Sequence, residues 1–129
     1  MNNILENKKI LLVDDNDFNR MIINIHLKKY NIIIKEAEDG NEAAKILENE
    51  SFDIMLIDIQ MPIYDGIYLI KKIKEMKINT PVIIMTASDE SSHTIKELRE
   101  IGIHDFIYKP FNKNLLIYTL AKKLNENEN

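Results

Sequence analysis

Residues Lys9–Asp15 read KILLVDD, and this stretch decides the predicted fold. Its run Ile10–Val13 is continuously apolar, which is typical of a strand buried on both faces of a parallel sheet. Two carboxylates, Asp14 and Asp15, follow where that strand ends. Because open α/β sheets bind ligands beyond the carboxyl ends of their strands, the stretch predicts a central strand with a polar site at its end.

Four more short apolar runs follow, with helical patterns between them. The other predicted strands are Ile32–Ala37, Ile54–Ile57, Val82–Met85 and Asp105–Tyr108. The predicted helices are Asp17–Tyr30, Asn41–Asn49, Ile67–Lys77, Ser91–Ile101 and a last one from a cap at Asn112 or Asn114 to about Leu124. Five βα units with short connections predict an α/β fold: a flavodoxin-like (βα)5, doubly wound parallel sheet of order 2-1-3-4-5.

The first predicted helix carries an apolar stripe. Asp17 is the expected N-cap, and Phe18, Met21, Ile22 and Ile25 recur at the i, i+3, i+4, i+7 spacing of one helical face. This spacing predicts that the four apolar side chains point into the core.

Length and composition indicate one domain, residues 1–129, with a core of about 8–124 and polar termini at 1–7 and 125–129. The net charge of −4 and pI near 5.4 argue against nucleic-acid or anionic-membrane binding. The chain has no cysteine, so disulfides and thiolate metal sites are excluded. A polar Met1–Lys9 predicts no signal peptide, and no apolar run is long enough for a membrane span. We therefore expect a cytoplasmic protein.

Polar residues follow four of the predicted strands. They are Asp14–Asp15, Asp58, Thr86 and Lys109. Adjacent carboxylates repel one another, and a hard divalent cation such as Mg²⁺ relieves that repulsion. No cysteine or histidine lies beside them in the sequence, which argues against zinc. An alternative for the acid pair alone is that it only starts a turn and caps a helix.

A carboxylate in such a cluster can also act as a nucleophile in aspartyl-phosphate chemistry. The transferred group needs its charge neutralised, which the Lys109 ammonium and the Thr86 hydroxyl can do beside a cation. The chain has only three glycines, which excludes a P-loop or a dinucleotide fingerprint.

These motifs together resemble the response-regulator receiver domains of two-component signal transduction, the CheY-like family. The resemblance covers roughly Lys8 to Leu124. Its carriers are Leu11–Asp15, Asp58–Gly66, Met85–Ala87 and Phe106–Phe111. Each motif alone is weak, but their joint occurrence in this order is highly specific.

The resemblance implies a role for each site residue. Asp58 would be the phosphoacceptor, paired with Lys109. Asp15, Asp58 and the backbone carbonyl of Gln60 would bind Mg²⁺, with Mn²⁺ as a substitute, and Asp14 would act mostly through a coordinated water. The Lys109–Pro110 peptide bond would be cis.

Thr86 and Phe106 resemble the switch pair of the family, which couples phosphorylation to a surface built from Ser91–Ile101, Asp105–Tyr108 and the last helix. Many members have tyrosine where this chain has Phe106. Tyr108, two residues on, is expected to offer a hydroxyl at the surface.

The implied function is a phosphoacceptor signalling module that catalyses only its own Mg²⁺-dependent phosphorylation and dephosphorylation. Its donor would be a histidine kinase or a phosphotransfer protein. Its output would pass to a downstream protein target, or to an effector domain if the chain is a receiver from a longer protein or a hybrid kinase. Two alternatives remain: a phosphorylation-independent interaction domain, and a haloacid-dehalogenase-type phosphatase. The phosphatase needs a second aspartate where Gln60 stands.

Overall fold

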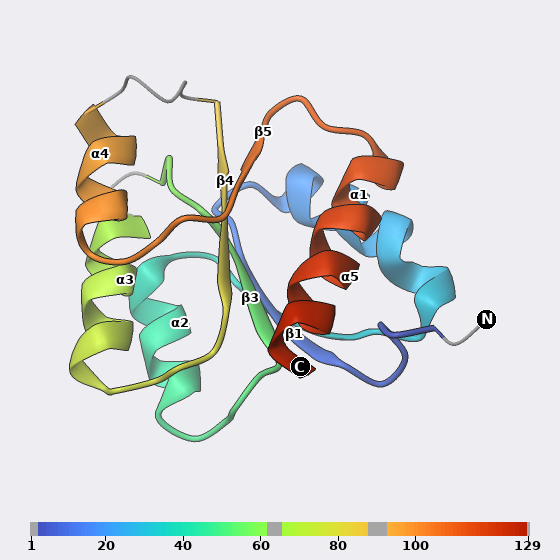
Figure 1. Ribbon diagram of the computed structural model, residues 1–129, viewed down its shortest axis with the longest axis horizontal. Coiled ribbons are helices and arrows are strands. Elements are labelled where there is room, and N and C mark those ends of the chain that lie inside the picture. Colours follow the sequence, from blue (N-terminus) through green and yellow to red (C-terminus); the bar gives the residue numbers. More distant parts are fainter. Residues whose placement is uncertain (1–2, 62–65, 88–92, 129) are drawn as a thin grey trace.

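The computed structural model describes residues 3–61, 66–87 and 93–128 (Figure 1). Its strands are β1 (Lys9–Val13), β2 (Ile33–Ala37), β3 (Ile54–Asp58), β4 (Val82–Thr86) and β5 (Phe106–Tyr108). Its helices are α1 (Asp17–Leu27), the 3-10 turn η1 (Lys28–Tyr30), α2 (Gly40–Leu47), α3 (Gly66–Glu75), α4 (His93–Glu100) and α5 (Lys113–Glu128). The predicted helix start at Ser91 and residues 62–65 of the Asp58–Gly66 motif lie outside the described residues.

The five strands form one parallel sheet in the predicted order β2-β1-β3-β4-β5. The order reverses between β1 and β3, whose pairing sets Val13 opposite Ile57. On the other side of β3, Asp58 pairs with Met85. The carboxyl ends of β1, β3 and β4 therefore lie at one edge of the sheet, at the switch point where such folds bind ligands.

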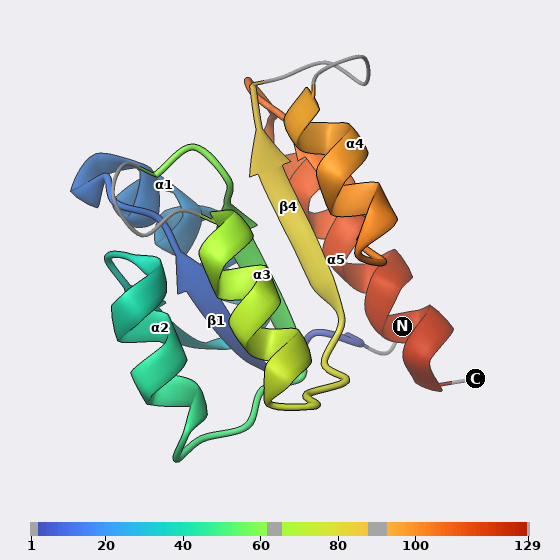
Figure 2. The same cartoon turned by 90° about the vertical axis from the view of Figure 1, so that its left-hand side faces the viewer.

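Helices cover both faces of the sheet. In Figure 1, α1 and α5 lie on one side and α2, α3 and α4 on the other, and Figure 2 looks onto the latter. Alternate strand residues supply the two cores, because successive side chains of a strand point to opposite faces. The α2–α3–α4 side contains Leu11, Val13, Met55, Ile57, Leu69, Ile73 and Leu98, and the α1–α5 side contains Ile10, Leu12, Ile54, Leu56, Ile23, Leu27 and Leu120.

The prediction of which face of α1 is buried is wrong. Phe18, Met21 and Ile25 are 62%, 49% and 63% exposed and Ile22 is half-buried, whereas the residues buried on this helix are Arg20, Ile23 and Leu27. Apolar residues occur on both sides of the helix, so their spacing alone does not say which side meets the sheet. Arg20 is not apolar, yet its side chain faces inward because its guanidinium hydrogen-bonds to Glu36 and to the Asp14 carbonyl.

The start of α1, the end of α5 and the N-terminal segment also differ from the predictions. The side chain of Asn16, and not Asp17, caps α1 by accepting from the Asn19 N–H at 2.9 Å. Helix α5 continues past Leu124 to Glu128, with Lys123 and Glu126 paired at 3.8 Å. Leu5, inside the segment predicted to be a polar terminus, is buried in the α1–α5 core.

Gly66 begins α3 at a close approach to the segment after β3. A Cβ added there would lie 2.4 Å from Ile59 Cδ1 and 2.9 Å from Ile59 Cα. Because backbone would have to move, we expect Gly66→Ala to lower the free energy of unfolding by about 1–3 kcal/mol. Urea unfolding followed by circular dichroism measures this. Lys71→Ala, at an exposed position of α3, should stay within about 0.5 kcal/mol of the parent; equal losses in both variants would contradict the prediction.

Candidate functional site

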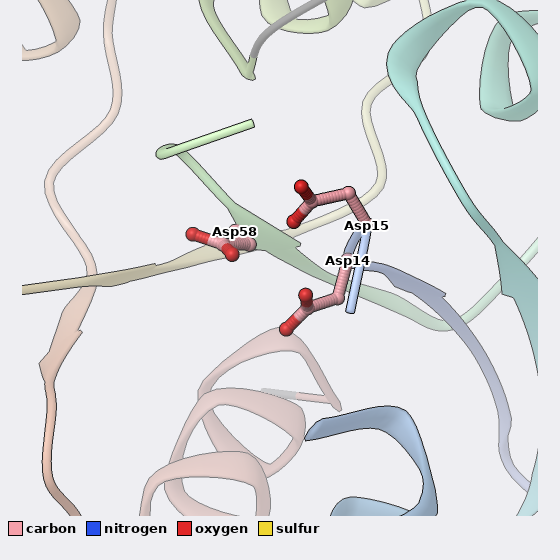
Figure 3. A group of neighbouring side chains, drawn as sticks. All are labelled: Asp14, Asp15 and Asp58. Atoms are coloured by element: carbon pink, nitrogen blue, oxygen red, sulfur yellow. The ribbon is translucent and has the colours of Figure 1, made fainter. Parts of the chain in front are cut away.

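Three carboxylates from two neighbouring strands share one space at the sheet edge. Asp14 and Asp15 follow β1, Asp58 ends β3, and Figure 3 shows their side chains close together at the ends of these strands. One oxygen from each lies within 4.8 Å of the others. Asp14 and Asp58 are buried, and Asp15 is exposed. The predicted convergence of these acids is therefore found in the structure.

Asp14 is the most constrained of the three. It is fully buried; its Oδ1 accepts from the Asn16 N–H at 2.9 Å, and its Oδ2 has no hydrogen-bond partner among the described residues. Burial raises the pKa of Asp14, and the charges of Asp58 and Asp15 raise it further, against the opposing effects of the Asn16 hydrogen bond and Lys109. An oxygen ligand that is buried and unpaired in an acidic cluster fits a hard divalent cation. The residues present therefore suit Mg²⁺.

Both oxygens of Asp58 have a partner. Oδ1 accepts from the Gln60 backbone N–H at 2.9 Å, and Oδ2 lies 3.2 Å from Lys109 Nζ. The Asp58 side chain is only 4% exposed, whereas that of Lys109 is 26% exposed. This pairing holds the Asp58 carboxylate in one orientation, and the half-buried lysine supplies a positive charge that a small anionic group can reach from solvent.

β4 and the segment after β5 complete the site. Thr86 is fully buried at the end of β4, and its carbonyl accepts from the Lys109 N–H at 2.8 Å. The Lys109–Pro110 peptide is cis. Gln60 reaches across with its side chain, since its Oε1 accepts from the Ala87 N–H at 3.2 Å. The segment after β3 is thereby joined to the end of β4, directly beside Asp58.

The aromatic residues of β5 contact each other and a side chain of α4. The rings of Phe106 and Tyr108 are stacked, with centroids 6.5 Å apart, and the Arg99 guanidinium from α4 lies 5.2 Å from the Phe106 ring centroid. The Tyr108 hydroxyl is buried and has no hydrogen-bond partner among the described residues. The expectation of a surface hydroxyl is therefore wrong.

Arg20 is a site residue that sequence reasoning missed. It is 7% exposed and donates to the backbone carbonyl of Asp14, the first residue of the acid pair. A lone basic residue within the segment Asp15–Arg20, one helical turn beyond Asp17, was the only available signal. A charged residue outside the apolar stripe of a helix is predicted to face solvent, and only the three-dimensional structure shows the partners of Arg20.

Comparison with known proteins identifies the family. The model of the response regulator receiver domain matches residues 10–121. The chain belongs to the response regulator receiver domain family. This receiver domain is 42% identical over 105 residues to the transcriptional regulatory protein ResD of Bacillus subtilis, covering 81% of the chain and 42% of ResD. It thus spans less than half the length of that relative.

Solved structures agree with the assignment. The receiver domain of the Francisella response regulator 1452 superposes with a TM-score of 0.82 at 33% identity, covering 95% of this chain and all of that one. The receiver domain of the sensor histidine kinase PA1611 from Pseudomonas aeruginosa has a TM-score of 0.82 at 26% identity, covering 92% of this chain and 98% of that one. The PA1611 structure has a magnesium ion coordinated in its active-site cleft.

Family membership settles the class of function. Receiver domains are generally signalling modules rather than enzymes; they take phosphoryl groups from histidine kinases and act on effector partners. They generally bind Mg²⁺ at an acidic pocket, and this chain has the corresponding aspartate cluster. Among the residues that the structure describes, no helix combines the length and apolarity needed to cross a membrane.

Proposed function

We propose that this receiver domain accepts a phosphoryl group on Asp58 in a Mg²⁺-dependent reaction and thereby changes the surface formed by α4, β5 and α5. The observation that carries the proposal is the environment of Asp58: a buried carboxylate, oriented by Gln60 and Lys109, beside two further acids within 4.8 Å. Buried acids that only stabilise a fold do not need this surplus of negative charge.

The proposed transfer is a single displacement at phosphorus. An oxygen of Asp58 forms the new P–O bond as the P–N bond of a donor phosphohistidine breaks, and the imidazole nitrogen keeps the electron pair. Positioning and charge neutralisation account for most catalysis in such reactions. Lys109 supplies one positive charge at 3.2 Å from Asp58, and the Thr86 hydroxyl is the proposed donor to another phosphoryl oxygen.

Mg²⁺ is the proposed cofactor, with Mn²⁺ as a substitute because both accept hard oxygen ligands. Asp15, Asp58 and the carbonyl of Gln60 are the proposed direct ligands, and Asp14 is proposed to act through water. The bound ion would neutralise charge on a transferring phosphoryl oxygen. The buried Oδ2 of Asp14 supports this assignment, because none of the described residues gives this oxygen a hydrogen bond.

Thr86 and Phe106 are the proposed switch pair. Thr86 is buried beside β5, where it pairs with Tyr108, and Phe106 precedes Tyr108 on the same side of the strand. A phosphoryl group adds roughly −1.5 to −2 charge. Drawing the Thr86 hydroxyl toward this charge would vacate space near the Phe106 ring, and a moving ring would leave its contact with Arg99 on α4. This links the site to the output surface.

The proposed partners are a histidine kinase or phosphotransfer protein as donor, and a downstream protein or an effector domain as target. The chain is similar both to a transcriptional regulator and to the receiver of a sensor kinase. This similarity supports a donor kinase and a downstream target, and is compatible with either kind of target. A cytoplasmic location is proposed, because a kinase donor needs the ATP of the cytoplasm and a chain without cysteine has no disulfide that would require an oxidising compartment.

The exposed apolar side chains of α1 support a docking surface for the donor. Phe18, Met21 and Ile25 lie on the helix that begins two residues after Asp15. We expect Phe18→Ser to slow phosphotransfer from a phosphorylated histidine-phosphotransfer domain roughly tenfold, because a lost aromatic anchor costs about 1 kcal/mol or more. Its phosphorylation by acetyl phosphate should be unchanged.

The matched control is Tyr118→Ser. Tyr118 has the same 62% exposure as Phe18 but lies on α5, near His104 and Phe106. This variant should accept phosphate from the protein donor at the parental rate. If Phe18→Ser slows both reactions equally, the side chain serves the site or the fold and not donor docking.

Incubation with acetyl phosphate, followed by intact-protein mass spectrometry, tests the proposed function. One phosphoryl mass should be added with Mg²⁺ or Mn²⁺ and none with EDTA. Absence of the adduct with acetyl phosphate and with a phosphohistidine protein would favour the interaction-only alternative. Rapid, multiple-turnover release of phosphate from acetyl phosphate without an adduct would favour the phosphatase alternative.

A further inference from the structure

Arg20 connects α1, the acid pair and the end of β2. Its Nη1 donates to the carbonyl of Asp14, and its Nε donates to Glu36 Oε1 at 2.9 Å. Its Nη2 pairs with Asp17 and lies 3.9 Å from Glu38 Oε1. The guanidinium thus donates to a backbone carbonyl while three acids hold its other nitrogens. This arrangement is rigid, because the planar group fixes all its donors together.

The contact with Asp14 fixes the peptide that carries both β1 acids. The Asp14 N–H donates to the Ala37 carbonyl at 3.1 Å, and the Asp14 carbonyl accepts from Arg20. The backbone is therefore held on both sides of Asp14 as the chain leaves the strand. The carbonyl belongs to the peptide bond that leads directly into Asp15.

Asp15 depends on this fixed backbone more than the other acids do. Asp14 accepts from the Asn16 N–H and Asp58 from the Gln60 N–H, so each has its own restraint. The Asp15 side chain is exposed, and the described part of the chain gives its carboxylate no hydrogen bond or ion pair. The backbone alone therefore sets the direction of its Cα–Cβ bond, and with it the space that its carboxylate can reach.

We propose that Arg20 is a positioning residue for the divalent cation, acting through the Asp14 carbonyl to hold Asp15 at the site. The proposal rests on the Mg²⁺ site of the proposed function and extends it to a residue that touches no ligand. Partners that orient metal ligands from behind commonly change metal affinity 10- to 100-fold when they are replaced.

The positive charge of Arg20 and its positioning role change the Mg²⁺ affinity in opposite directions, which makes the proposal testable. A nearby positive charge repels Mg²⁺, so removing it without other effects would tighten binding. Arg20→Lys keeps the charge and loses the planar fork. We expect this variant to bind Mg²⁺ roughly tenfold more weakly than the parent in calorimetric titration with MgCl₂. Arg20→Gln, which removes the charge, should also bind more weakly.

Two controls separate positioning from other effects. Glu36→Gln breaks one ion pair of Arg20 but leaves the Asp14 contact, so its Kd should stay within about twofold of the parent at physiological salt. Asp15→Asn removes a proposed ligand and should abolish binding. Circular dichroism at the titration temperature shows that each variant is folded, and a purely structural role of Arg20 would lower stability without changing the Kd of the folded protein.

The outcomes are distinct. Weaker binding by both Arg20 variants, with Glu36→Gln near parental, supports the proposal. Parental Kd in folded Arg20→Lys, tighter binding by Arg20→Gln, or an equal loss in Glu36→Gln overturns it while leaving the metal site intact. If the parent itself binds no Mg²⁺, the metal site of the proposed function fails and the inference fails with it.

Discussion

Lys109→Met is expected to slow phosphorylation by acetyl phosphate about 10²- to 10³-fold at saturating Mg²⁺. Lys109 Nζ lies 3.2 Å from Asp58 Oδ2, so it is the protein cation best placed to neutralise the transferring group. Losing one preorganised electrostatic contact of this kind typically costs about 2.7–4 kcal/mol of transition-state stabilisation. Mass spectrometry over a time course gives the rate.

Metal binding distinguishes the role of Lys109 from general damage to the site. Removing a positive charge beside the acids should leave the Mg²⁺ affinity unchanged or tighter. A slow variant that still binds Mg²⁺ therefore supports direct charge neutralisation. Lys122→Met, an exposed lysine on α5, should react at the parental rate. A parental rate in Lys109→Met would contradict the proposed role.

Asp14→Asn is expected to stabilise the metal-free protein at pH 7 and to reduce the stabilisation that Mg²⁺ gives. Burial of the Asp14 carboxylate and the charges of Asp58 and Asp15, partly offset by the Asn16 hydrogen bond and Lys109, suggest a gain of roughly 1–3 kcal/mol. The parent should gain about 2.7 kcal/mol when Mg²⁺ is present at 100 times its Kd. Thermal unfolding with EDTA and with MgCl₂ measures both effects. Lower stability of the variant in EDTA would contradict the account.

The pH dependence of this difference follows from the raised pKa of Asp14. At this group the folded protein binds more protons than the unfolded protein does. Its contribution to the free energy of unfolding is therefore fully present when the pH is below the ordinary aspartate pKa of 3.8, and it is lost as the pH rises through the folded pKa. The asparagine variant lacks this loss. Its advantage over the parent in EDTA should therefore increase from about pH 4 upward and then level off. An advantage that shrinks with rising pH would have the wrong sign.

The sequence was sufficient for the sheet and the acid cluster because both depend on local patterns. Runs such as Ile10–Val13 and Ile54–Ile57 are apolar at every position and too short for a helix, which is typical of a strand covered on both faces. Once those strands are parallel neighbours, Asp14, Asp15 and Asp58 must meet at one edge. The family resemblance added the roles of these residues, which spacing alone does not supply.

The orientation of α1 could not be predicted, because it depends on contacts between distant segments. The stripe through Phe18 and the face through Arg20 are both helical faces, and Arg20 faces inward only because the Asp14 carbonyl and Glu36 meet it there. The Tyr108 hydroxyl is a similar case, since its burial cannot be seen in the local pattern of the strand that carries it.

The most direct test of the account is to locate the phosphoryl group. The protein is phosphorylated with acetyl phosphate and Mg²⁺, digested at acid pH, and analysed by fragmentation mass spectrometry alongside Asp58→Asn. One phosphoryl group is expected in the peptide that contains Asp58, and none in the variant. A phosphoryl group on another residue, such as Asp14 or Asp15, or equal labelling of Asp58→Asn, would contradict it.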